Sequence, residues 1–170
     1  MQPLATFKPL VLNPERERLV KAVYSALNDI DRAKFRPIET LHERYPELTK
    51  AYDDVYARFN TEAASVGLAE WLRFVILDRK FGLMFSDLPI DDARSLYQQM
   101  ESIGYPEINS LISHRMIWAN RLAEEGEFEE AHTVAKHLFN DVDAFRKLYP
   151  NVLVKDIDDD LARFRQRIGM

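Results

Sequence analysis

The chain has 170 residues, of which 46% are hydrophobic and 30% are charged, and this composition is typical of a globular domain. It contains no cysteine, which excludes disulfide scaffolds, thiolate zinc sites, iron–sulfur clusters and cysteine nucleophiles. The N-terminal residues do not read as a secretory signal, and no apolar stretch approaches the roughly 20 residues of a membrane span. We therefore expect a cytoplasmic protein without a membrane partner.

The net charge of −5 is unevenly distributed along the chain. Residues 1–85 carry 13 basic and 12 acidic side chains, whereas residues 86–170 carry 10 basic and 16 acidic ones. Domains that bind nucleic acid duplexes normally show a basic excess on one face, so the charge argues against a nucleic-acid partner. The acidic C-terminal half favours a partner with a basic surface.

Glycine and proline residues separate apolar runs with a period near 3.6, which predicts an all-α fold of roughly seven to nine helices. Asn13 and Pro14 are suited to the cap and the first position of a helix that ends before Pro37. A short helix is expected over residues 38–45, and the next one begins at Pro46. We expect an extended arm over residues 1–13 and a single helical domain over residues 14–170.

Residues 68–81 are apolar on most sides, which predicts a central helix that the other helices surround. Residues 82–90 then form a loop that either folds back on the core or serves as a contact surface. Further helices are expected from Asp91 or Asp92 to Gly104, from Pro106 to Leu122, and over residues 128–138, 142–149 and 158–167. The short apolar runs 10–12 and 152–154 indicate either a small ribbon that joins the two ends of the chain or tightly packed coil.

Two Glu-x-x-His steps, Glu39–His42 and Glu129–His132, place a carboxylate and an imidazole on one face of a helix. Di-iron bundles use two such steps together with a glutamate from each of two further helices. This pattern gives an alternative function, a metal-dependent helical-bundle enzyme that holds iron or another divalent metal. The competing interpretation is that Glu39 and Glu129 are first-turn acids that the helix dipole favours.

Four aromatic residues, Tyr52, Tyr56, Trp71 and Trp118, give a second alternative, in which they line the pocket of a small-molecule binder. The competing interpretation is that they are core residues whose polar tips reach water or a backbone carbonyl.

Between Arg115 and Leu138 the chain resembles one tetratricopeptide-type hairpin. Ala119 and Ala131 occupy the small positions of its two helices, Leu122 a large position, and Gly126 the turn, which Phe128 follows. Small residues at these positions allow two helices to approach closely. The resemblance covers about one repeat of 34 residues and has no second copy in the chain. It implies an antiparallel helical hairpin and, by analogy, peptide or protein binding.

The sequence contains no nucleophile elbow, no phosphate-binding glycine loop and no H-E-x-x-H motif. The leading hypothesis is therefore a non-enzymatic protein-interaction module without a cofactor, such as an adaptor, inhibitor or immunity-type protein, whose partner can also be a second copy. An apolar patch rimmed by charge is typical of a partner site. The expected partner-binding residues are Leu83, Met84, Phe85 and Leu88 in the apolar segment and Glu124, Glu125, Glu127 and Glu130 in the acidic turn.

Overall fold

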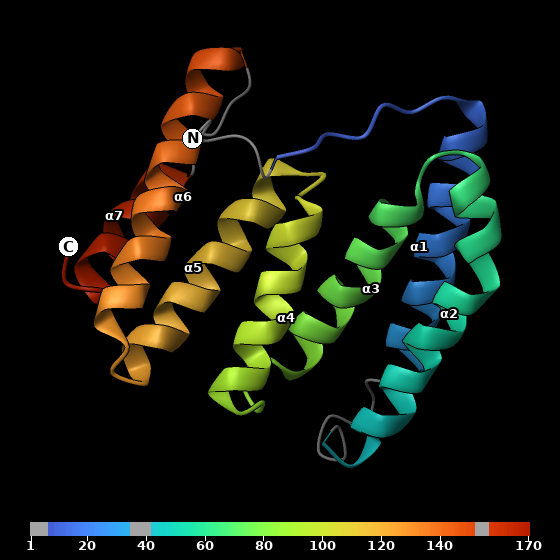
Figure 1. The fold of residues 1–170 in the computed structure, drawn as a ribbon, viewed down its shortest axis with the longest axis horizontal. Helices are drawn as coiled ribbons and strands as arrows, with labels where there is room; N and C mark the ends of the chain where they lie inside the picture. Colours follow the sequence, from blue (N-terminus) through green and yellow to red (C-terminus); the bar gives the residue numbers. More distant parts are fainter. Residues whose placement is uncertain (1–6, 35–41, 152–156) are drawn as a thin grey trace. The chain divides into compact units, whose positions relative to one another are not determined.

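The computed structural model describes residues 7–34, 42–151 and 157–170, and within these ranges it contains helices and no strand (Figure 1). The elements in chain order are α1 (Pro14–Lys34), the 3-10 helix η2 (His42–Arg44), α2 (Tyr45–Ser65), α3 (Ala69–Met84), α4 (Ile90–Ile103), α5 (Ile108–Glu124), α6 (Phe128–Leu148) and α7 (Ile157–Arg167). The predicted all-α fold is confirmed, and the seven α-helices of the described ranges lie within the expected number.

The chain divides into two compact units. Unit 1 comprises residues 1–9 and 104–170, and it contains α5, α6 and α7. Unit 2 comprises residues 10–103, and it contains α1 to α4. The single domain expected over residues 14–170 and the central role expected for residues 68–81 stay predictions.

The start of α1 is the one that the sequence predicts. The backbone N–H of Arg16 donates to Oδ1 of Asn13 over 2.9 Å, and Pro14 is the first helical residue. Arg16 also connects parts of unit 2, because its Nε donates to the carbonyl of Val66 over 2.8 Å and its Nη1 to the carbonyl of Val11 over 2.8 Å. One side chain thus joins the start of α1 to the end of α2 and to the preceding extended residues.

Within unit 2, α3 contacts both α2 and α4 (Figure 1). Contact on two sides explains why apolar residues lie almost all round this helix. Those that are buried are Trp71, Leu72, Phe74, Val75, Ile76, Phe81 and Leu83. Gly82 lies inside α3, and the N–H of Phe85 still donates to the carbonyl of Phe81 over 3.0 Å. The helix therefore continues past Phe81, where the sequence predicts a loop.

In unit 1, α5 and α6 pack against each other as an antiparallel hairpin (Figure 1). Ala119, Leu122 and Ala131 are completely buried, and Gly126 forms the turn with a φ of +85°, a conformation that glycine adopts readily. The hairpin expected from these positions is confirmed. However, α6 is one helix of 21 residues, so the prediction of separate helices over 128–138 and 142–149 is wrong. The polar pair Asn140–Asp141 does not interrupt it, because Asp141 is buried and paired with Arg115.

The ribbon expected between residues 10–12 and 152–154 cannot be followed, because residues 152–154 lie outside the described ranges. Phe7 instead forms an isolated parallel bridge with Tyr105. Val11 and Leu12 are 75% and 50% exposed.

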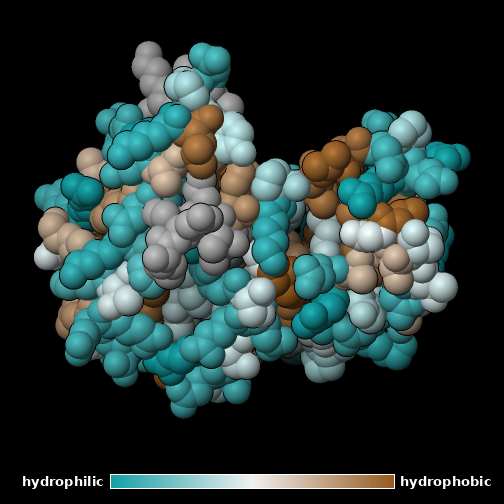
Figure 2. All heavy atoms as spheres, turned by 45° about the horizontal axis from the view of Figure 1, so that its top comes forward, coloured by the Kyte–Doolittle hydropathy of each residue, from teal (hydrophilic) through white to brown (hydrophobic). Residues whose placement is uncertain are grey.

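On the face of the molecule in Figure 2, hydrophilic residues cover most of the surface and hydrophobic ones gather in small patches. No helix of the described ranges has both the length and the apolar character needed to cross a membrane.

The close packing of α5 on α6 predicts that Ala119→Leu is destabilising. Ala119 has no exposed surface, so a larger side chain must push the helices apart, at a cost of about 1–3 kcal/mol. Urea unfolding followed by circular dichroism measures this loss. The control Ala57→Leu lies on an exposed face of α2 and should change stability by less than about 0.5 kcal/mol. Equal effects of the two substitutions would contradict the packing described.

Candidate functional site

The turn between α5 and α6 carries the acidic residues expected from the sequence. Glu124, Glu125, Glu127 and Glu129 are all exposed, and Glu130 is half-buried. Phe128, the first residue of α6, lies among them with 56% of its surface exposed. Glu125 forms an ion pair with Arg121, whose Nε lies 3.0 Å from Oε1 of that glutamate. The acidic turn, defined as residues 124–130, therefore presents an exposed aromatic side chain that glutamates flank in the sequence.

The apolar segment 82–90 belongs to unit 2 and is only partly covered by it. Leu83 is 6% exposed, and Phe85 and Leu88 are half-buried. The Phe85 ring stacks on Phe81 with 5.2 Å between ring centroids. Met84 is the last residue of α3, and its side chain lies outside the described part. Leu83 and Phe85 therefore pack back toward the core. This is one of the two alternatives that sequence analysis leaves open for this segment.

The loop after Phe85 is also held by a polar contact. The hydroxyl of Tyr45 at the start of α2 donates to Oδ2 of Asp87 over 2.6 Å. Burial, followed by the hydrogen bond and the negative charge of Asp87, raises the pKa of Tyr45 to about 12. The loop between α3 and α4 is therefore joined to α2 within unit 2.

The structure describes only the second of the two Glu-x-x-His steps in full. Glu39 and the side chain of His42 lie outside the described part of the chain. Glu129 is exposed, whereas Nε2 of His132 lies 2.6 Å from the carbonyl oxygen of Ile168, just beyond α7. This contact lets the imidazole satisfy a carbonyl at the end of the last helix. Among the described residues no group of three or more histidine or acidic side chains could hold a metal ion, and the metal site stays a prediction.

The four aromatic candidates are mostly core residues. Tyr52, Trp71 and Trp118 are 0%, 5% and 1% exposed, and Tyr56 is half-buried. Trp118 belongs to unit 1 and the other three belong to unit 2. The ring of Trp71 packs edge-on against Tyr24, with 5.8 Å between centroids. The small-molecule pocket stays a prediction.

A hollow of about 250 Å³ lies between α6 and α7 in unit 1. Its apolar wall includes Phe139, on whose ring the guanidinium of Arg165 lies 4.1 Å from the centroid. Across it Arg146 pairs with Asp158 over 2.5 Å. The charged lining residues are two arginines and two aspartates, Arg146, Arg165, Asp143 and Asp158, so the hollow favours neither sign of charge.

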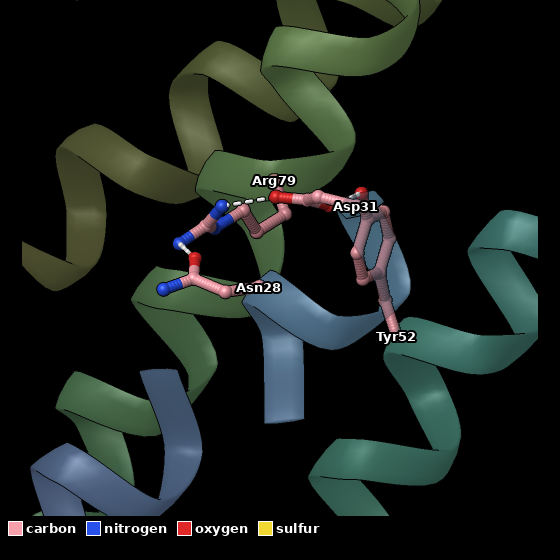
Figure 3. Close-up of polar contacts among 4 residues, drawn as sticks. All are labelled: Asn28, Asp31, Tyr52 and Arg79. Atoms are coloured by element: carbon pink, nitrogen blue, oxygen red, sulfur yellow. Dashed lines mark hydrogen bonds and ion pairs between the residues drawn. The ribbon is translucent and has the colours of Figure 1, made fainter. Parts of the chain in front are cut away.

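A polar cluster joins three helices of unit 2 (Figure 3). Asp31 of α1 accepts a hydrogen bond from the hydroxyl of Tyr52 over 2.6 Å and forms an ion pair with Arg79 of α3. Arg79 also donates to Oδ1 of Asn28 over 3.2 Å. Asp31 and Arg79 are about one-quarter exposed, whereas Tyr52 is completely buried. The cluster therefore reaches from the buried core of unit 2, at Tyr52, to the partly exposed side chains of Asp31 and Arg79 at the edge of that core.

The environment of Tyr52 favours its neutral form. Burial first, and then the hydrogen bond and the negative charge of Asp31, raise the pKa of Tyr52 well above its ordinary value of 10.0, although Arg79 acts in the opposite direction. Sequence analysis gives Tyr52 as either a pocket residue or a core residue but does not find its partner, because Asp31 is 21 residues away on another helix.

A second feature missed by sequence analysis is the ion pair between Arg115 of α5 and Asp141 of α6. The two side chains are 4% and 3% exposed. Buried charges are costly unless they are paired, so this contact fixes how the two helices of the hairpin align. Asp141 stands between Leu138 and Val142 in the sequence, and both of these residues are buried. An acidic residue on an inward stripe is the signal that could have pointed to this pair.

Comparison of the chain with protein-family models, with curated proteins and with solved structures finds no match.

The buried ion pair predicts a strongly non-additive response to substitution. Asp141→Leu leaves the guanidinium of Arg115 without its carboxylate and should lower the free energy of unfolding by about 3–5 kcal/mol. The double variant Arg115→Met/Asp141→Leu should lose less than this, because it leaves no buried charge unpaired. Urea unfolding measures both values. As a control, Asp54→Ala breaks an exposed pair with Lys50 and should cost less than about 0.5 kcal/mol.

The polar cluster predicts a stability change at high pH. Because folding raises the pKa of Tyr52, its stabilising effect is complete below about pH 10 and falls as the pH rises through the higher pKa of the folded state. Tyr52→Phe should cost about 1–2 kcal/mol at pH 7 and make the stability loss above pH 10 shallower. The control Tyr56→Phe removes a hydroxyl from the same helix. Unfolding curves with the same slope above pH 10 for both variants would refute this role of Tyr52.

Proposed function

We propose that this chain is a non-enzymatic protein-interaction module that binds a basic partner surface through the acidic turn. The observation that carries the proposal is the exposure of Phe128, 56% of whose surface is accessible among four exposed glutamates. An exposed aromatic side chain is a typical anchor in protein interfaces, and surrounding carboxylates steer a basic partner toward it.

The rigidity of the turn supports this proposal. The N–H of Glu127 donates to the carbonyl of Leu122 over 2.8 Å, and that of Gly126 to the carbonyl of Ala123 over 3.1 Å. These bonds close the end of α5 directly before Phe128, so little conformational entropy is lost when a partner covers the turn. The proposal rests on the acidic turn and not on the apolar segment, since Leu83 is buried.

The same reasoning favours a salt-dependent association. The carboxylates of Glu124, Glu125 and Glu127 are exposed, so added salt screens their attraction for a basic surface. The Phe128 contact depends on apolar area, and salt screening leaves it unchanged. The adaptor, inhibitor and immunity-type roles all remain within this proposal, as does location in the cytoplasm.

Two substitutions test the proposal with a partner first isolated by affinity capture on the wild-type chain. Phe128→Ser should weaken binding about tenfold or more, because an aromatic anchor is lost. Glu124→Gln/Glu125→Gln/Glu127→Gln should mainly slow association and reduce its dependence on salt. Surface plasmon resonance at two salt concentrations, about 0.05 M and about 0.3 M, measures both effects. The Debye length is shorter at the higher concentration, so the attraction between charges is weaker there.

Matched controls separate the turn from general surface effects. Leu148→Ser removes another exposed apolar side chain, which is 65% exposed at the other end of α6. Glu15→Gln/Glu17→Gln/Glu62→Gln removes the same charge from exposed positions of unit 2. Both controls should bind as the wild type does. If they weaken binding as much as the turn variants do, or if the turn variants bind normally, the proposal is wrong.

A further inference from the structure

The first described residues of the chain dock onto unit 1. Phe7 forms a parallel bridge with Tyr105, and the N–H of Lys8 donates to the carbonyl of Tyr105 over 2.7 Å. This is one step of strand addition, in which an extended segment binds through its backbone. The contact joins residues that are almost 100 positions apart in the sequence.

The side chain of Phe7 lies against aromatic rings from the end of α6. Its ring packs edge-on against Phe145, with 5.6 Å between centroids, and against Tyr149, with 6.3 Å. Phe145 and Tyr105 are buried, and Tyr149 is 41% exposed. We call the set Tyr105, Phe145 and Tyr149 the aromatic seat. It supplies both a backbone acceptor and an edge-to-face site for one aromatic side chain.

Gly104 shapes the neighbouring contact with Lys8. Its φ is +96°, and a Cβ built there would lie 2.9 Å from Cδ of Lys8. The aliphatic part of the Lys8 side chain therefore occupies space that only glycine leaves open. The seat thus fits an aromatic residue followed by a long side chain in an extended segment.

The residues that connect Phe7 and Lys8 to α1 leave apolar surface uncovered. Val11 is 75% exposed and Leu12 is 50% exposed. Pro9 and Pro14 flank this connection, and the residue before a proline favours extended backbone. If the extended connections of two chains lie side by side, they can bury apolar surface that one connection alone leaves in water.

We propose that the aromatic seat also takes Phe7 and Lys8 from a second copy of this chain, so that two copies exchange their N-terminal segments. The fit of this occupant is the fit that the segment has within its own chain. Every aromatic seat is filled both in the single chain and in the exchanged dimer, so exchange neither adds nor removes a contact in the seat. The exposed Val11 and Leu12 give the exchanged form apolar area that the single chain leaves in water.

The balance between the two forms is then set by protein concentration. A segment on a short connection meets its own seat at an effective concentration on the order of 1 mM. Without any gain from Val11 and Leu12, about a tenth of the chains would be dimer at about 0.05 mM and about half at about 1 mM. Sedimentation equilibrium should therefore find at least these fractions. A wild-type chain that stays monomeric at the higher concentration overturns the proposal.

A mixing experiment then tests whether the dimer uses the seat. Phe7→Ala keeps an intact seat but has a defective segment, and Tyr149→Ala keeps the segment but weakens the seat at a partly exposed position. Only the mixed dimer restores one intact contact between ring and seat. Its association constant should exceed that of either variant alone by about two- to tenfold beyond the statistical factor, the value of one aromatic pair.

The control mixture combines Phe7→Ala with Leu148→Ala, whose exposed side chain precedes Tyr149. This pair has no contact to regain, so it should show no preference for the mixed dimer. Because the chain lacks cysteine, Lys21→Cys on α1 provides one labelling site for energy transfer between copies in both mixtures. Equal preference in the two mixtures means that the dimer uses another surface, and the proposal fails.

Discussion

The alignment of α5 with α6 determines the position of every feature proposed to be functional in unit 1. Two contacts of different kinds fix that alignment. The completely buried Ala119 and Ala131 allow the helices to approach, and the buried pair of Arg115 with Asp141 sets their register. Apolar packing alone tolerates small shifts along the axes, whereas a buried charge loses its partner when one helix slides. The ion pair therefore favours this alignment of the two helices over shifted ones.

This alignment has a consequence for the two ends of α6. The helix has 21 residues, so its ends lie about 30 Å apart at 1.5 Å per residue. Phe128 stands at the first end among the glutamates of the acidic turn, and Tyr149 follows the second end within the aromatic seat. A partner on the turn and an exchanged segment on the seat therefore do not compete for the same surface. One helix can present both sites at once.

Sequence analysis predicts the helices well where local signals decide them, as at Asn13 and Pro14 before α1 or at Gly126 between α5 and α6. It fails where a distant partner decides. The sequence predicts separate helices over residues 128–138 and 142–149, yet α6 continues through Asp141, which Arg115, 26 residues away, pairs with inside the hairpin. Likewise, Leu83 reads as part of a loop, although neighbouring helices bury it. Of the candidate site, the glutamates of the acidic turn were found because exposed charge is readable locally. Phe128, in contrast, falls on the apolar stripe of α6 and is expected to point inward, but 56% of its surface is exposed.

The N-terminal segment is the clearest case of a contact without a local signal. Lys8 and Tyr105 are joined by one backbone hydrogen bond, while the intervening chain folds into unit 2. Closing a loop of this length costs entropy that grows only slowly with length, and a folded unit 2 leaves far fewer residues free to move. The hairpin of unit 1 needs only neighbouring residues, so it can form first and present the seat before Phe7 arrives. A contact that a terminal segment makes on a surface built by other residues is one that a second chain can also make.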